Sequence, residues 1–283
     1  MPEGTNSVPA VLMLAGSGPT DRNGNSTLSG VKPATLQLLA QALAAEGIAS
    51  LRIDKRGIGA SAPAMRSEYD LRFDTYVDDA MGWARFLKAQ PRVKCVVILG
   101  HSEGALVGAL AAGQTAPCGF ISLAGAGRTA PDIMVEQLNA QAAAGALSQA
   151  LLAQATDAIA VLKKGQLVTN PPAELGALFR PSVQPYLISW FAKDPVTAIA
   201  AIKGPVLVLQ GANDLQISVD DARRLATARP GIELVVLPSV NHILKSAPPD
   251  RTGNIATYTN PELPLAPGVV AAIVAFIRKN VNQ

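Results

Sequence analysis

The stretch "VVILGHSEGALVGALAA" (Val96–Ala112) decides the fold of this chain. An apolar, β-branched run ends at the pentapeptide Gly-His-Ser-Glu-Gly (100–104), and a run rich in alanine and leucine, typical of a helix, follows it. Because the two glycines carry no side chains, strand and helix can approach closely, and a residue between them is held in a strained, exposed geometry. The stretch therefore predicts a strand-to-helix turn that presents Ser102 for chemistry. In the alternative, the turn serves packing and Ser102 only caps the helix.

Strand-like and helix-like segments alternate on both sides of this turn. Apolar runs of strand length lie at 10–16, 48–54, 93–100, 118–127, 204–211 and 232–238. Helical patterns lie at 32–47, 75–90, from the turn to about 113, at 218–228 and at 267–280. This alternation predicts an α/β fold with a mostly parallel sheet, helices on both of its faces, and a ligand site at the carboxyl ends of the strands.

The alternation stops between residues 128 and 202. No strand is predicted there, and the runs 131–166 and 172–202 have helical patterns that prolines interrupt. Since alternation resumes at 204, the sequence predicts one α/β core, residues 1–127 and 203–283, with a helical cap insertion at 128–202. A length of 283 residues and a hydrophobic content of 49% are sufficient for a core of this size.

Composition excludes several classes of function. The net charge is +3 and no block of lysine or arginine occurs, so nucleic acid is not an expected partner. No apolar run is long enough to predict a membrane span. The N-terminus lacks the charged and apolar regions of a signal peptide, which predicts a cytoplasmic protein as the chain stands, or a periplasmic or secreted one if a leader has been removed.

The two cysteines, Cys95 and Cys118, do not form a Cys-x-x-Cys pair, so no zinc or redox motif is predicted. Both lie where consecutive predicted strands begin, so a disulfide between neighbouring parallel strands is geometrically conceivable. We favour two inert, buried thiols over a bridge. No metal and no cofactor is expected.

A serine nucleophile needs a base, and the chain has only two histidines. His101 adjoins Ser102, so its side chain is expected to point away and to be packed and hydrogen-bonded. His242, in the loop after the last strand, is therefore the predicted general base. Asp214, in the loop after the strand at 204–211, is the predicted third member; its competitors, Asp220 and Asp221, open a helix, where acidic residues usually complement the helix dipole.

An acyl-transfer site also needs donors for an oxyanion. The amide of Glu103 follows the nucleophile at the positive end of its helix. The glycine-rich loop "LAGSGPTDRNGN" after the first strand is expected to supply the second donor, from the amide of Ser17 or, failing that, of Gly18. Its spacing fits neither a Walker A motif nor a dinucleotide fingerprint.

These residues resemble the α/β-hydrolase family, in its Ser…Asp…His order. "DKRGIGAS" (54–61) is similar to the D-x-R-G-x-G-x-S stretch of many members, and "AGSGPTDRNG" (15–24) resembles a bacterial esterase subgroup with the loop G-S-G-P-x-D-R-[DN]-G. Ala15 stands where many relatives have histidine. The resemblance implies the α/β-hydrolase fold and a cofactor-independent serine esterase for short- to medium-chain acyl esters.

Several alternatives stay open. Within the fold they are an acyl thioesterase, a serine peptidase or a polyester hydrolase; outside enzymes, a non-catalytic ligand-binding protein. The expected partner is a small-molecule or lipid-like ester, and the chain is expected to be a monomer or a dimer.

The cap supplies candidate pocket residues. An acyl or alcohol pocket is predicted to include Met134, Leu187, Trp190 and Phe191, although apolar residues at helical spacing more often form the core of a cap. Asp21 and Arg22 are expected to be either a pair that supports the oxyanion loop or a solvated turn.

Overall fold

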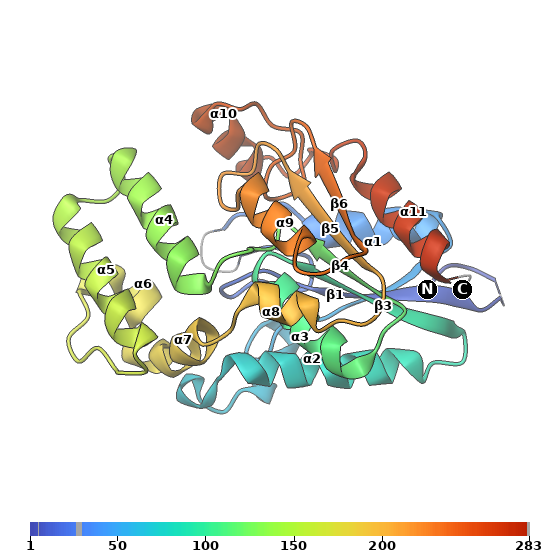
Figure 1. The fold of residues 1–283 in the computed structure, drawn as a ribbon, viewed down its shortest axis with the longest axis horizontal. Coiled ribbons are helices and arrows are strands. Elements are labelled where there is room, and N and C mark those ends of the chain that lie inside the picture. Colours follow the sequence, from blue (N-terminus) through green and yellow to red (C-terminus); the bar gives the residue numbers. More distant parts are fainter. Residues whose placement is uncertain (5, 27–29, 282–283) are drawn as a thin grey trace.

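A parallel sheet forms the centre of the molecule. The computed structural model describes residues 1–4, 6–26 and 30–281, and within them six strands lie in the order β2-β1-β3-β4-β5-β6, all parallel (Figure 1). The strands are β1 (Val8–Leu14), β2 (Ala49–Arg52), β3 (Val93–His101), β4 (Gly119–Leu123), β5 (Val206–Gly211) and β6 (Ile232–Leu237). All six predicted strands are thus confirmed, as is the α/β class.

Helices cover both faces of this sheet. One face packs against α2 (Phe73–Lys88), α3 (Glu103–Thr115), α8 (Pro195–Ala200) and α9 (Val219–Ala226), and the other against α1 (Thr35–Ala45) and α11 (Val269–Val281). Side chains alternate between the two faces along each strand, so that Leu12 and Ile98 lie in one core while Met13 and Leu99 lie in the other. Apolar runs without polar alternation are what a sheet buried on both faces requires.

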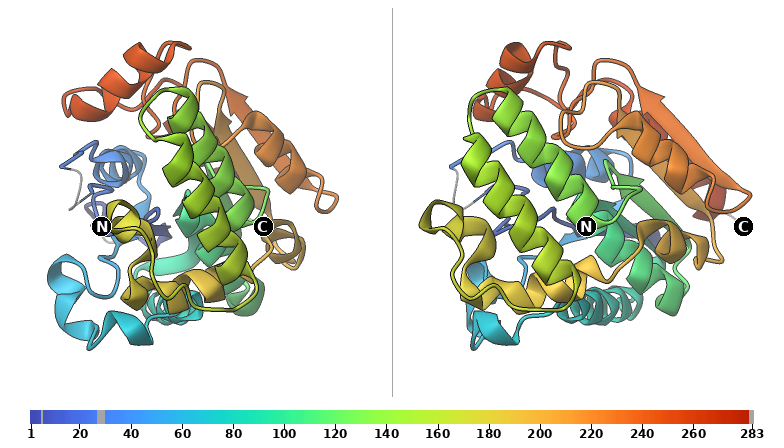
Figure 2. Two further views of the ribbon diagram at one scale, coloured as in Figure 1. Left: turned by 90° about the vertical axis from the view of Figure 1, so that its left-hand side faces the viewer. Right: turned by 60° about the vertical axis from the view of Figure 1, so that its left-hand side comes forward.

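The chain between β4 and β5 holds only helices, as the sequence predicted. The two long ones, α4 (Ala130–Ala143) and α5 (Gln149–Lys163), lie side by side in front of the sheet (Figure 2). The turn between them passes through Gly145, whose φ of 73° lies in the left-handed region that glycine adopts without strain. Shorter helices follow: η3 (Ala173–Leu175), α6 (Gly176–Phe179), η4 (Pro181–Val183) and α7 (Gln184–Phe191).

Some short elements carried no clear signal in the sequence. They are η1 (Gly59–Ala64), η2 (Glu68–Asp70), α10 (Arg251–Ala256) and η5 (Thr257–Thr259). Each has six residues or fewer, too few for a helical pattern of apolar residues to repeat in the sequence. No helix in the described ranges has the length and apolar character needed to cross a bilayer.

Candidate active site

The turn between β3 and α3 has the geometry of a strained elbow. Ser102 has φ 56° and ψ −121°, a backbone conformation rare for residues other than glycine, and its N–H donates to the carbonyl of Leu123 on β4 at 2.9 Å. The two glycines are required by space: a Cβ on Gly100 would lie 2.0 Å from the carbonyl oxygen of Gly104, and one on Gly104 would lie 2.5 Å from that of Leu14. Such strain persists only where the surrounding structure enforces it, and it is typical of functional sites.

Replacing Gly100 with alanine should therefore lower the free energy of unfolding by about 3 kcal/mol or more, because backbone cannot move away from the new methyl group cheaply. Urea unfolding measures the change. Gly113→Ala is the control: it lies in α3, the helix that follows the elbow, where the nearest atom to a new Cβ is 3.9 Å away. This variant should keep or raise the stability by up to about 1 kcal/mol. Equal stability of the two variants would contradict the steric account.

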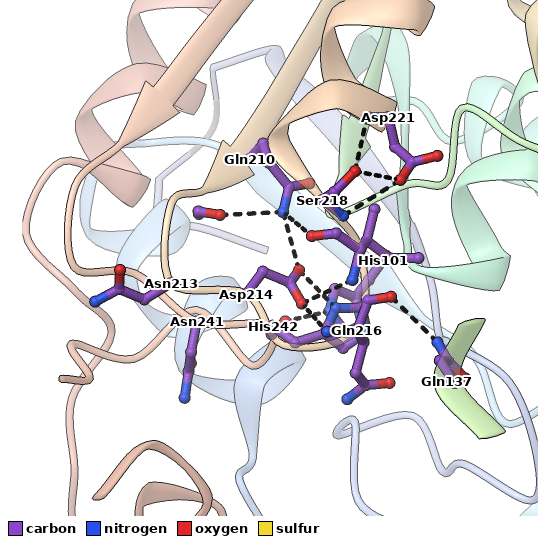
Figure 3. Close-up of polar contacts among 12 residues, drawn as sticks. His101, Gln137, Gln210, Asn213, Asp214, Gln216, Ser218, Asp221, Asn241 and His242 are labelled. Carbon is purple, nitrogen blue, oxygen red and sulfur yellow. Dashed lines mark hydrogen bonds and ion pairs between the residues drawn. The ribbon is translucent and has the colours of Figure 1, made fainter. Parts of the chain in front are cut away.

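Asp214 and His242 meet beside the elbow. Nδ1 of His242 lies 2.8 Å from Oδ2 of Asp214, whose side chain is fully buried (Figure 3). The other carboxylate oxygen of Asp214 accepts from the backbone N–H groups of Gln216 at 2.7 Å and Ile217 at 3.0 Å. Burial alone would raise the pKa of Asp214, but the interaction with His242 and the two backbone donors hold it below its usual value. This carboxylate is thus ionised at neutral pH and accepts a hydrogen bond from the Nδ1–H group of His242.

Sequence reasoning missed a further partner of this carboxylate, Gln210, at the end of β5. Its side-chain amide is completely buried and donates to Oδ2 of Asp214 at 3.0 Å and to the carbonyl of Ile217 at 3.0 Å (Figure 3). A signal was present: Gln210 is the polar residue in the apolar run "VLVLQG". A buried amide in such a run needs hydrogen-bond partners, which the loop behind Asp214 provides.

His101 links the elbow to the loop of His242. Its Nε2 lies 2.7 Å from the carbonyl oxygen of His242, and the two rings are 4.9 Å apart between centroids. Burial is the main cause that lowers the pKa of His101, to about 4, and the neighbouring His242 adds to it. The ring is therefore neutral at pH 7, and its Nε2–H donates to the carbonyl of His242. His101 is therefore hydrogen-bonded within the structure, as expected. Because it directly precedes Ser102, this bond holds the backbone of His242 next to the elbow.

The two competing aspartates lie elsewhere. Asp221 accepts from the Ser218 hydroxyl at the start of α9 and pairs with Arg128 at 2.8 Å, and Asp220 lies on the surface, where it pairs with Arg223. Both therefore serve the helix terminus, as acidic residues in a first turn usually do. Of the three candidates, Asp214 is the one in contact with His242.

Arg22 holds the loop after β1, but its partner is not the one considered from the sequence. Its backbone N–H donates to Oδ1 of Asp54 at 2.8 Å and its Nε to Oδ2 at 2.9 Å, whereas Asp21 accepts from the backbone of Asn23 and Asn25 in its own turn. Asp21 and Arg22 thus bind different partners. The contact joins "GSGPTDR" to "DKRG", two motifs that lie far apart in the sequence.

Buried ion pairs predict how stability depends on pH. Asp54 and Asp221 have nearly or fully buried side chains; burial would raise the pKa of each, but hydrogen bonds from Arg22 and Arg128 hold both below the usual value. The unfolded chain therefore binds protons at these sites more readily, and their stabilisation is present above about pH 4 and is lost as the pH falls through the lowered pKa values. Urea midpoints should fall between about pH 5 and pH 3. Asp221→Asn should show a smaller fall than the parent; an identical fall would contradict the assignment to Asp221.

The predicted oxyanion residues lie beside Ser102. A Cβ on Gly16 would lie 3.2 Å from Cβ of Ser102, which shows how closely the loop after β1 approaches the elbow. Ser17, Gly18, Ser102 and Glu103 all line one cavity of ≈ 300 Å³. The loop and the start of α3 are thus the two backbone segments that face the same space.

The insertion supplies most of the other walls of this cavity. Met134, Leu187 and Trp190 line it. Phe191 does not: it is 6% exposed and packs into the hydrophobic core, because apolar residues at helical spacing serve packing as readily as a pocket. Tyr186, on the same helix, also lines the cavity, and its buried hydroxyl has no hydrogen-bond partner among the described residues.

Cys95 and Cys118 are free thiols that lie next to each other at the start of β3 and β4. Burial, and then the hydrogen bond with Cys118, raise the pKa of Cys95 to about 12, so its thiol is protonated and inert at neutral pH. Within the described part of the chain, no group of three or more histidine, cysteine or acidic side chains is arranged to hold a metal ion.

Known proteins similar to this chain include several esterases. Esterase EstD of Thermotoga maritima is 25% identical over 251 residues, which cover 87% of this chain and 57% of that protein, so the chain spans little more than half of its length. Est1E of Butyrivibrio proteoclasticus, solved with ferulic acid, superposes with a TM-score of 0.59 and 15% identity over 98% of this chain and 91% of that one. The esterase domain of a Rhodothermus marinus protein has a TM-score of 0.57 and 18% identity over 99% and 90%.

Family membership rests on the match to a family model. Residues 34–245 of the 283 match the family described as serine aminopeptidase, S33, and this range includes the elbow, Asp214 and His242. The structural similarity, at such low identity, concerns the fold alone. The chain has the α/β-hydrolase fold and belongs to the serine aminopeptidase, S33, family of hydrolases.

Proposed function

We propose that this protein is a serine carboxylic-ester hydrolase that acts through Ser102, His242 and Asp214. The observation that carries the proposal is the buried pair Asp214–His242, which His101 connects to a strained elbow carrying Ser102. A serine on such a turn, a histidine that a carboxylate orients, and two backbone segments that face the same cavity are the parts of an acyl-transfer site.

The reaction would proceed in two steps. Oγ of Ser102 attacks the ester carbonyl while Nε2 of His242 takes the hydroxyl proton, and the same nitrogen returns this proton to the leaving alcohol. Asp214 stabilises the imidazolium that forms. Water, activated by His242, then releases the acid from the acyl-enzyme.

The amides of Ser17 and Glu103 would hold the oxyanion, with Gly18 as the alternative to Ser17. Backbone N–H groups suit this role because they cost no reorganisation during the reaction. Ala15 in place of the histidine of many relatives does not alter a backbone donor.

The cavity favours short- to medium-chain acyl esters. Its volume of ≈ 300 Å³ is at the lower end for small-molecule sites, and its walls include the apolar residues Leu106, Ile133, Met134, Leu187 and Trp190. Since α4 and α7 provide several of them, we propose that residues 128–202 act as a cap over the site.

The family's description includes aminopeptidases, so peptide hydrolysis is the main alternative. An aminopeptidase must bind a free α-amino group, which requires a carboxylate not already neutralised. Glu103 is the carboxylate that lines the described cavity, and Lys55 already pairs with it at 3.3 Å. The charge arrangement therefore favours a neutral ester over a peptide.

A substrate panel tests the reaction class. Turnover of p-nitrophenyl acetate, butyrate and octanoate should exceed that of aminoacyl p-nitroanilides and acyl-CoA thioesters, with a preference for acetate or butyrate. Preferential cleavage of anilides or thioesters would move the assignment to the peptidase or the thioesterase. No turnover of any of these by the folded protein would favour a non-catalytic ligand-binding protein.

A further inference from the structure

Lys55 is buried beside the proposed oxyanion hole, although it was not among the site residues expected from the sequence. It follows β2 in "DKRG" and is only 9% exposed. Its ammonium group donates to the carbonyl oxygen of Gly16 at 2.7 Å, lies 3.3 Å from Oε1 of Glu103, and is 5.2 Å from the centroid of the Tyr76 ring. A buried ammonium needs such partners, and each of these belongs to a different part of the chain.

The contact with Gly16 fixes the direction of a neighbouring N–H group. The carbonyl of Gly16 and the N–H of Ser17 belong to the same planar peptide, and no cis peptide bond occurs among the described residues. In a trans peptide these two groups point in opposite directions. While Lys55 holds the Gly16 carbonyl, the Ser17 N–H must therefore point to the other side of the peptide.

A flip of this peptide would be costly for catalysis. It would replace a donor by a carbonyl oxygen, which repels the negative charge of an oxyanion. The charge-assisted bond from Lys55 opposes the flip, because the Gly16 carbonyl would lose a buried cationic donor.

The same ammonium group also engages the residue that supplies the second donor. The side chain of Glu103 is 2% exposed, and its carboxylate pairs with Lys55, while its backbone N–H begins α3 next to Ser102. One side chain thus ties the loop after β1 to the first residue of α3. These are the two segments whose spacing defines the hole.

Lys55 acts from behind the site and not from within it. It lines a separate cavity of ≈ 420 Å³ together with Tyr76 and Trp83 on α2, and it is not among the residues that line the cavity of Ser102. Direct contact with the substrate therefore does not explain its position.

We propose that Lys55 is a positioning residue, which sets the oxyanion hole by holding the Gly16–Ser17 peptide and Glu103 in a fixed relation. This inference rests on the proposed esterase function. In this role Lys55 lowers the free energy of the transition state by orienting the oxyanion donors, and it does not contribute to substrate binding.

The test compares Lys55→Met/Glu103→Gln with Glu103→Gln. Removing both charges leaves no unpaired buried ion, which avoids the main cause of misfolding in Lys55→Met alone. In Glu103→Gln the Lys55 ammonium keeps the Gly16 carbonyl and the Tyr76 ring as partners. Loss of one oxyanion donor costs about 100- to 1000-fold in kcat, so loss of its positioning should lower kcat by about 10- to 100-fold. KM for p-nitrophenyl butyrate should change by less than about threefold, because ground-state contacts remain.

A boronic acid provides the second measurement. Phenylboronic acid binds a catalytic serine as a tetrahedral adduct and uses the oxyanion donors, so its affinity should weaken in parallel with kcat. Arg56→Met is the control for the loss of a cation from this loop, because Arg56 pairs with Asp79 and lines the same cavity as Lys55. This variant should keep the kcat and the boronic acid affinity of the unmodified protein. Thermal unfolding and circular dichroism establish that all variants fold.

The outcomes separate the two proposals. A kcat and a boronic acid affinity within twofold of Glu103→Gln, or an effect on KM alone, would overturn the role of Lys55 while leaving the esterase assignment in place. An unmodified protein that folds but hydrolyses no ester would overturn the esterase assignment, and with it the role of Lys55.

Discussion

Replacing Ser102 with alanine should lower kcat/KM for p-nitrophenyl butyrate by at least about a thousandfold. The variant lacks the nucleophile and retains only what the oxyanion donors and the pocket contribute. The chain should stay folded, since the Cβ of Ser102 and its close approach to Gly16 are preserved. Steady-state kinetics and thermal unfolding measure the two effects.

Ser122→Ala is the matched control for this variant. Ser122 lies on the neighbouring strand β4, is 1% exposed, and its hydroxyl has no hydrogen-bond partner among the described residues. Its removal should leave kcat/KM within about twofold and should not destabilise the fold by more than about 1 kcal/mol. If Ser102→Ala kept a tenth or more of the activity, Ser102 would not be the nucleophile.

Replacing Asp214 with asparagine should lower kcat by up to about 10,000-fold. An asparagine side chain can turn its N–H₂ group toward Nδ1 of His242, which would place the imidazole proton on Nε2 and leave no base for Ser102. It would also weaken the bonds from the amides of Gln216 and Ile217. We therefore expect KM to change little and stability to fall by about 1–3 kcal/mol.

Asp220→Asn controls for the loss of a negative charge near this loop. Asp220 is 76% exposed on its side chain and pairs with Arg223 on the surface, so its variant should match the parent in both kcat and stability. If Asp214→Asn reduced activity no more than Asp220→Asn, the carboxylate beside His242 would have no part in the reaction.

Much of the fold could be predicted because its signals are local. Each strand is an apolar run of strand length, and each run alternates with a helical pattern. The elbow could be predicted for the same reason, since a serine between two glycines at a strand-to-helix junction is readable within five residues. The shortage of histidines then left His242 as the one base to consider.

The contacts that support the site could not be predicted, because they join segments that only the fold brings together. Arg22 pairs with Asp54 and not with its neighbour Asp21, and Lys55 reaches both Gly16 and Glu103. No local pattern in "DKRG" indicates which residues will lie above it. Phe191 shows a limit of local patterns. Its helical spacing is clear in the sequence, but spacing alone does not tell whether an apolar side chain lines a pocket or packs in the core.

Covalent labelling of the intact protein tests the central claim most directly. A fluorophosphonate probe reacts with a serine that a histidine activates and an oxyanion hole supports, whatever the natural ester is. We predict stoichiometric labelling, with the adduct located on Ser102 by peptide mass spectrometry and abolished in Ser102→Ala. A folded protein that stays unlabelled, or that carries the adduct on another serine, would contradict the account.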